Sequence, residues 1–190
     1  MLRAACVWGC LALAACEHEP GTGKTGEAAV TSPDTRLALL LGGPAEDGFE
    51  LALAPRAFEF PRDHGPHRRF RHEWWYLTGH LDSASGERFG FELTFFRFAL
   101  TPGSPPVKQS SRWRSNQVYV AHFAITDEAR HAFHSAERRE REALGLAGAR
   151  TGPLRVWVQD WRLDSTTVGW RLSAADGAYA LSLTCLLAAR

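Results

Sequence analysis

The sequence predicts a mostly β protein whose antiparallel strands form a barrel or a sandwich, with one short helical excursion. From Phe58 onward, stretches rich in Trp, Phe, Tyr and Val are separated by Gly, Pro, Asp and Ser at the spacing of turns. In residues 89–98, alternate positions form an apolar row, which is typical of a strand with one buried face. The short connections between these stretches favour antiparallel pairing.

Six strands are expected, at residues 73–81, 88–100, 117–126, 154–163, 169–174 and 179–185. Segments 82–86 and 175–177 are expected to be hairpin turns, because Asp and Gly lie there between apolar runs. Residues 127–144 differ, since four of them fall at helical spacing among many Arg and Glu: Phe133, Ala136, Glu140 and Leu144. A short amphipathic helix ended by Gly145 is expected there, or an excursion over the barrel mouth.

The start of the chain has the features of a bacterial export signal. Arg3 is followed by an uncharged apolar run at residues 4–13 and by small residues before Cys16. The run is shorter than the ~20 residues that a membrane-spanning helix needs. Residues 1–15 are therefore expected to be a signal peptide, and its end resembles the lipobox of bacterial lipoproteins. An ordinary signal cut after Ala15 is the alternative.

The lipobox resemblance implies that the sulfur of Cys16 carries a diacylglycerol, which would hold the mature chain at a membrane. Glu17, in place of an aspartate, resembles cargo sent to the outer membrane, so the expected location is the periplasmic face of that membrane. Residues 16–36 are rich in Gly and charge and are expected to be a flexible tether. Residues 37–190 are expected to form one folded domain.

The cysteine content argues against an internal disulfide, and the charge argues against a nucleic-acid partner. Cys6 and Cys10 would leave with the signal and Cys16 would be acylated, so Cys185 would have no internal disulfide partner. The formal net charge is +1, and basic residues are mixed with acidic ones, so no nucleic-acid partner is expected. The chain also has no Gly-x-Ser-x-Gly elbow and no complete phosphate-binding loop.

The strand that contains Glu73 is the first candidate site. Alternation puts Glu73 on one face with Trp75 and Leu77, and Trp74 and Tyr76 on the other face. If the first face is the interior, burial favours the protonated carboxyl, which would make Glu73 a usable proton donor. The alternative is a structural ion pair of Glu73 with Arg71 or Arg97. Asp63, in the preceding segment, is the second candidate acid.

Arg97 ends the apolar row of residues 89–95 and needs an anion, either a protein carboxylate or the acid group of a ligand. His64, His67, His72 and His80 suggest a metal site only weakly, because Gly-Pro separates the first two and no second ligand pair follows. We therefore expect no metal, and histidines that stabilise a turn. His122, in the middle of a strand, is expected to be a core histidine with its hydrogen bonds satisfied.

Seven segments between about Phe58 and about Leu183 form a recognisable series of motifs. They are Asp63-His64-Gly65-Pro66-His67, Glu73-Trp74-Trp75-Tyr76-Leu77-Thr78-Gly79, Thr94-Phe95-Phe96-Arg97, Ala121-His122-Phe123-Ala124-Ile125-Thr126-Asp127, Phe133-His134, Gly145-Leu146-Ala147-Gly148-Ala149 and Val156-Trp157-Val158-Gln159-Asp160-Trp161. This series resembles the AttH-like and carotenoid 1,2-hydratase family, whose members are often labelled secreted hydrolases.

The resemblance implies a pair of lipocalin-like β-barrel domains with an apolar cavity. In the hydratase branch, water adds to the terminal double bond of an acyclic carotenoid without any cofactor. This reaction needs an acid that protonates the alkene, aromatic faces that stabilise the cation, and a water molecule. Candidate ligand-binding residues are Trp74, Trp75, Tyr76, Arg97, Tyr119, His122 and Trp161.

Family members are nearly twice as long as this chain, and their second domain carries another His-Glu-Trp segment. The chain is therefore expected to correspond to the first domain, with an apolar face on which a second domain would pack. Three functions follow as hypotheses. The domain binds or hydrates an apolar molecule, it is a non-catalytic periplasmic carrier of lipid or another apolar metabolite, or it is a secreted hydrolase.

Overall fold

The computed structural model describes residues 48–103 and 115–186. The predicted signal peptide, the lipidation site Cys16 and the tether lie outside the described residues. One turn of 3-10 helix, η1 (Arg62–His64), precedes the first strand. Among the described residues, no helix is long and apolar enough to cross a membrane.

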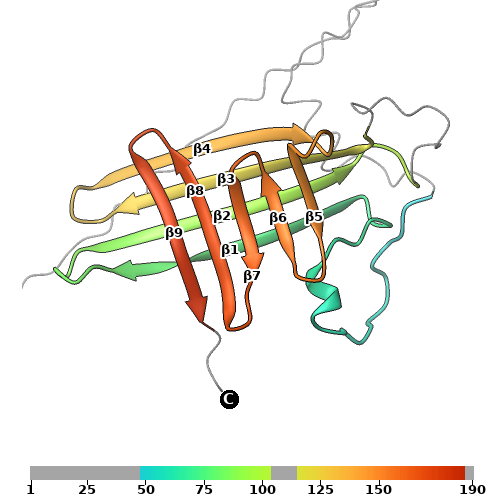
Figure 1. The fold of residues 1–190 in the computed structure, drawn as a ribbon, viewed down its shortest axis with the longest axis horizontal. Coiled ribbons are helices and arrows are strands. Elements are labelled where there is room, and N and C mark those ends of the chain that lie inside the picture. The colour runs from blue at the N-terminus through green and yellow to red at the C-terminus, as the bar shows by residue number, and fades with distance from the viewer. Residues whose placement is uncertain (1–47, 104–114, 187–190) are drawn as a thin grey trace, which may run out of the picture.

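Within the described residues, nine strands form two antiparallel sheets, and in each sheet the strands pair in the order in which they follow along the chain. The first sheet contains β1 (His72–Asp82), β2 (Arg88–Ala99), β3 (Gln117–Asp127) and β4 (Ala132–Arg141). The second contains β5 (Ala147–Arg150), β6 (Arg155–Val158), β7 (Trp161–Ser165), β8 (Gly169–Asp176) and β9 (Tyr179–Leu186). Figure 1 shows the second sheet lying across the first, with its strands crossing those of the first sheet steeply.

The prediction of a mostly β fold is confirmed, and of its two forms the structure is a sandwich, because the two sheets do not close into a barrel. Both predicted hairpins are present, between β1 and β2 and between β8 and β9. The single strand predicted at 154–163 is wrong. Gln159 adopts a positive φ of 57° and ends β6, and the chain returns as β7. This turn escaped prediction because apolar residues flank it on both sides without Gly or Pro.

The predicted helix at 127–144 is also wrong, since these residues include β4, which pairs along its whole length with β3. The pattern was ambiguous. Ala136, Glu140 and Leu144 are four positions apart, and a spacing of four satisfies the strand period of two as well as the helical period. On β4, Ala136 faces inward while Phe133 is exposed. Gly145 still ends the segment, in a turn with a φ of 76°.

The hydrophobic core lies between the sheets and takes side chains from both. The first sheet supplies Leu93, Phe95 and Phe123, all fully buried, and the second supplies Val156 and Trp161. Phe123 and Trp161 meet edge to face across the sandwich, with ring centroids 5.6 Å apart. These side chains occupy the space that a closed barrel would keep open for a ligand. Any ligand site formed by the described residues is therefore expected at the margins of the core.

Replacement of Leu93 by Ala is expected to lower the free energy of unfolding by about 2–5 kcal/mol, because it leaves a cavity between the sheets. Leu53→Ala makes the same change at a side chain that is 84% exposed and should shift it by no more than about 0.5 kcal/mol. Urea denaturation followed by Trp fluorescence measures both. Equal effects of the two substitutions would contradict the assigned core.

Candidate functional site

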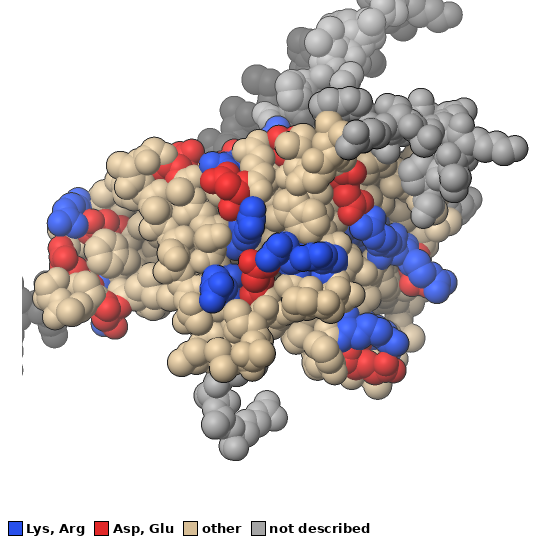
Figure 2. Space-filling view, viewed as in Figure 1, with Lys and Arg blue, Asp and Glu red and all other residues tan. Residues whose placement is uncertain are grey.

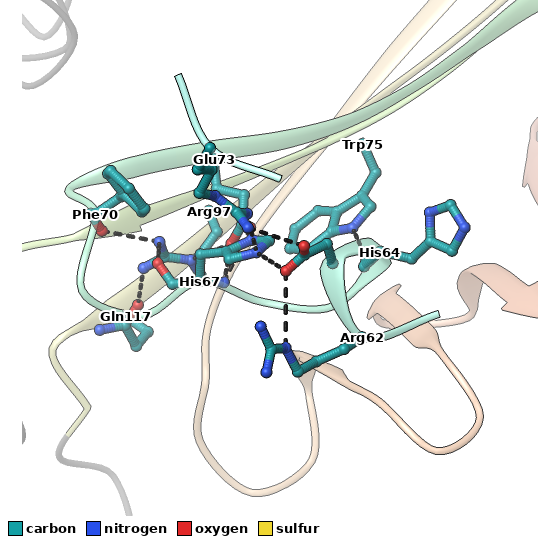
Figure 3. A network of polar contacts seen from close by, with 10 residues as sticks. Arg62, His64, His67, Phe70, Glu73, Trp75, Arg97 and Gln117 are labelled. Carbon is teal, nitrogen blue, oxygen red and sulfur yellow. Dashed lines mark hydrogen bonds and ion pairs between the residues drawn. The ribbon is translucent and has the colours of Figure 1, made fainter. Parts of the chain in front are cut away.

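The two predicted acids, Asp63 and Glu73, lie at the two ring nitrogens of His67. Figure 3 shows His67 close to Glu73 and Arg97. His67 Nδ1 is 2.6 Å from Glu73 Oε1, and His67 Nε2 is 3.2 Å from Asp63 Oδ1. The side chains of Asp63 and Glu73 are 3% and 13% exposed, whereas that of His67 is 30% exposed. The carboxylates are thus almost covered, and the imidazole is the member of the three that solvent or a ligand can reach.

The turn of η1 places the Asp63 carboxylate in contact with the ring of His67. Asp63 Oδ2 accepts hydrogen bonds from the backbone N–H of Glu59 at 2.6 Å and from Arg56 Nη1 at 2.8 Å. Gly65 follows the turn and is required there, since a Cβ atom at this position would lie 1.9 Å from the Thr151 side chain. The Gly-Pro segment therefore lets the loop lie against the β5–β6 turn while His67 points back to β1.

Arg97 is the buried centre of the site. Its Nε donates to Glu73 Oε2 at 3.0 Å and its Nη1 donates to Gln117 Oε1 at 2.7 Å. Its Nη2 donates to the backbone carbonyl oxygens of His67 at 3.0 Å and Phe70 at 2.9 Å. The anion that Arg97 needs is therefore supplied by Glu73, which is the ion pair predicted as the structural alternative. In this geometry Arg97 also holds the loop that carries His67.

The pKa values of Asp63 and Tyr119, which lie near this centre, are shifted from their usual ranges. The guanidinium of Arg56, with the backbone N–H of Glu59 and the ring of His67, holds the pKa of Asp63 well below its usual range. Burial raises the pKa of Tyr119, which pairs with Arg97 in register on β3. The Tyr119 hydroxyl has no hydrogen-bond partner within the described part of the chain. The phenol is therefore a neutral group at the buried end of the site.

An apolar hollow of about 690 Å³ opens beside His67. One wall is the irregular segment 51–58, which precedes η1, and the polar part of the lining includes Arg56, His67 and Glu73. The apolar part of the lining includes Leu51, Leu53, Pro55, Phe58 and Phe70. The acid–imidazole group and an apolar surface therefore share one hollow. Within the described ranges, no three His, Cys, Asp or Glu side chains are arranged to hold a metal ion.

The aromatic residues predicted to bind a ligand are spread over three environments. Trp74 and Tyr76 are exposed on the outer face of β1, whereas Trp75 faces inward and donates from Nε1 to the His64 carbonyl oxygen at 2.8 Å. Trp75 and Tyr76 line a second, smaller hollow of about 250 Å³ with His64, Leu77, Leu154, Leu163 and Trp170. The Trp75 side chain therefore lies on the opposite face of β1 from those of Trp74 and Tyr76, as alternation predicted, although Tyr76 also borders the hollow that Trp75 lines.

The remaining predicted residues lie away from the hollow. Trp161 and Tyr119 are fully buried, and Trp161 Nε1 donates to the Ala175 carbonyl oxygen at 2.9 Å. His122 was expected in the core, but it lies on the outer face of the first sheet with 43% of its side chain exposed. Its Nε2 is 2.8 Å from Glu137 Oε2 on β4, so the histidine is satisfied by a surface partner. The structure does not bring Trp161 or His122 together with Glu73, whereas Tyr119 lies beside Arg97 at the buried end of the site.

Two parts of the site were not predicted from the sequence. His67 was interpreted as a turn histidine, although its position between the two candidate acids, four residues after Asp63 and six before Glu73, was a usable signal. Segment 51–58 was overlooked because it forms no strand or helix. Its alternating Leu51 and Leu53 were the only sign of an apolar wall.

Replacement of Asp63 by Asn is expected to destabilise the protein at neutral pH, because the contacts of the ionised carboxylate with Arg56 are lost. The pKa of Asp63 in the fold lies below the unfolded value of about 3.9. The stabilisation is therefore complete above that value and is lost as the pH falls through the folded-state pKa. The stability gap between the parent and the variant should narrow below about pH 4.

Urea unfolding at about pH 7, 5 and 3 measures this gap. Asp82→Asn on the exposed β1–β2 hairpin is the matched control. A gap for Asp63→Asn that stays constant over this pH range would contradict the assignment.

Comparison with known proteins agrees with the motifs and the fold. A family model described as AttH-like matches residues 51–188. A crystal structure of a putative AttH from Nitrosomonas europaea is 36% identical over 68% of this chain, with a TM-score of 0.55. The match covers 39% of the length of that protein's chain. No curated protein matches. From its sequence match and its fold, this chain belongs to the AttH-like family.

Proposed function

We propose that this domain binds an apolar small molecule in the hollow beside His67. The observation that supports the proposal is the combination of a volume of about 690 Å³ with a mostly apolar lining and a few polar side chains. Ligand sites in proteins commonly have this size and composition. Because an apolar hollow by itself accounts for binding and not for a reaction, non-catalytic binding, as in a carrier, is the first candidate function.

Exposed apolar side chains in the hollow would favour ligand binding through the hydrophobic effect. Leu51, Leu53 and Phe58 are each more than half exposed. A bound hydrocarbon would remove part of this surface from water, at about 25 cal/mol for each Å² of apolar area covered. Arg56 Cζ lies 4.8 Å from the centroid of the Phe58 ring, which keeps this wall next to the polar group. A ligand with a hydrocarbon body and one polar end matches this lining best.

Hydration of a carbon–carbon double bond is the second candidate function, favoured by the position of His67 between two carboxylates. In this reaction protonated His67 would transfer a proton to an alkene carbon, and water would add to the cation and return a proton to the imidazole. Nε2 is the nitrogen that we assign to this transfer, because its contacts with Asp63 at 3.2 Å and with Arg56 Nη2 at 3.3 Å are both longer than the contact of Nδ1 with Glu73. The hydratases that the sequence resembles use no cofactor, and none is invoked here.

Binding and hydration can be tested in one experiment with an acyclic carotenoid in detergent. We expect saturable quenching of Trp fluorescence, and binding weakened by about tenfold in Leu53→Asp, which places a charge in the apolar wall. Leu186→Asp introduces the same charge at an exposed leucine on β9, outside the hollow, and should bind like the parent. Equal affinity of the parent and Leu53→Asp would exclude the hollow as the site.

Mass spectrometry of the recovered carotenoid separates the two functions. A gain of one water that is abolished in His67→Gln, with binding retained, identifies a hydratase. Binding without a mass change identifies a carrier. Turnover of a panel of chromogenic esters would instead support the secreted-hydrolase alternative.

We also infer from the sequence that the domain is tethered to the periplasmic face of the outer membrane by lipid on Cys16. Expression of the full chain in a bacterium fed labelled palmitate should give a labelled protein in the membrane fraction. Cys16→Ser should abolish the label, whereas Cys10→Ser, inside the predicted signal, should retain it. Label that persists in Cys16→Ser would refute the anchor.

A further inference from the structure

Arginine side chains gather on the outer face of the second sheet, on the side facing away from the core. The register places Arg150 opposite Arg155, Arg155 opposite Asp164, and Asp164 opposite Arg171. In the neighbouring row Trp157 lies opposite Arg162. Figure 2 shows this face, with blue side chains gathered over the middle of the second sheet around a red one.

The charges of this cluster are not balanced by the protein. Arg155 forms an ion pair with Asp164. Arg150, Arg162 and Arg171 are exposed and make no ion pair within the part of the chain that the structure describes. Like charges directly opposite each other on adjacent strands are destabilising, as at Arg150 and Arg155. A bound anion would remove this repulsion.

Beside the arginines lies a hollow of about 270 Å³ whose lining includes Arg150, Arg155 and Arg162 but no carboxylate among its described residues. Its apolar wall is Trp157, which is held in place by two features. The Trp157 Nε1 donates to the Gly145 carbonyl oxygen at 2.9 Å. The ring also lies over Gly148, where a Cβ atom would be 2.7 Å from it. The wall is therefore fixed before any ligand arrives.

We propose that this hollow, here called the arginine site, binds a phosphate group. Guanidinium groups present paired N–H donors that match phosphate oxygens, and three of them surround one space. A phosphate carries more charge than a carboxylate and has more acceptor oxygens with which to engage three arginines. The arginine site lies on the opposite side of the second sheet from the core, and it does not depend on the apolar hollow beside His67.

The test uses the full mature chain with Cys16→Ser, so that a lipid anchor cannot contribute to binding. Titration calorimetry with inorganic phosphate at low ionic strength is the first arm. Cosedimentation with vesicles of phosphatidylglycerol, compared with phosphatidylcholine alone, is the second arm. The double variant Arg150→Gln, Arg162→Gln removes two donors, and the control Arg88→Gln removes one charge from the β1–β2 hairpin.

We expect saturable binding that weakens by about tenfold or more in the double variant and by less than about twofold in Arg88→Gln. Without phosphate, the double variant should be at least as stable as the parent, because repulsion is relieved. Binding of free phosphate indicates a soluble phosphate compound, and binding only to phosphatidylglycerol vesicles indicates a lipid headgroup. Binding in neither arm, or equal binding by the parent and the double variant, would overturn the proposal.

Discussion

The candidate site depends on one buried guanidinium. Arg97 is fully buried on β2, and its donors reach β1 through Glu73, β3 through Gln117, and the loop that carries His67. A buried charge is tolerated only when it is paired and hydrogen-bonded, so these partners are constrained together. The position of the loop that carries His67 follows from the requirement to satisfy Arg97, whereas Asp63 is oriented by Arg56 and the backbone N–H of Glu59.

The space between the two sheets is filled by side chains, so both candidate sites lie outside the core. Because Phe95, Phe123 and Trp161 fill the space between the sheets, the hollow beside His67 is built from an irregular segment before β1. The arginine site lies on the outer face of the second sheet for the same reason. A rigid core supports both places, and their loops or outward-facing side chains can present functional groups without disturbing it.

Prediction from the sequence was correct where a residue pattern was compatible with only one type of secondary structure. Alternation in β1 correctly put Glu73 and Trp75 on one face, which the structure shows to be the inner face. It failed at β4, where the spacing of Ala136 and Glu140 suits a strand as well as a helix, and pairing with β3 decided between them. It also failed at Gln159, where a tight turn forms without Gly or Pro.

The sequence by itself determined the β class, which side chains of β1 and β2 share a face, and membership of the AttH-like family, because these depend on the local order of residues. Only the tertiary structure decided which partner Glu73 takes, since Arg97 is 24 positions away and Arg71 was an equal candidate. It also decided that the two acids share His67, and that three arginines from β5, β6 and β7 line one hollow. Such juxtapositions arise from strand register and loop packing, which local patterns do not encode.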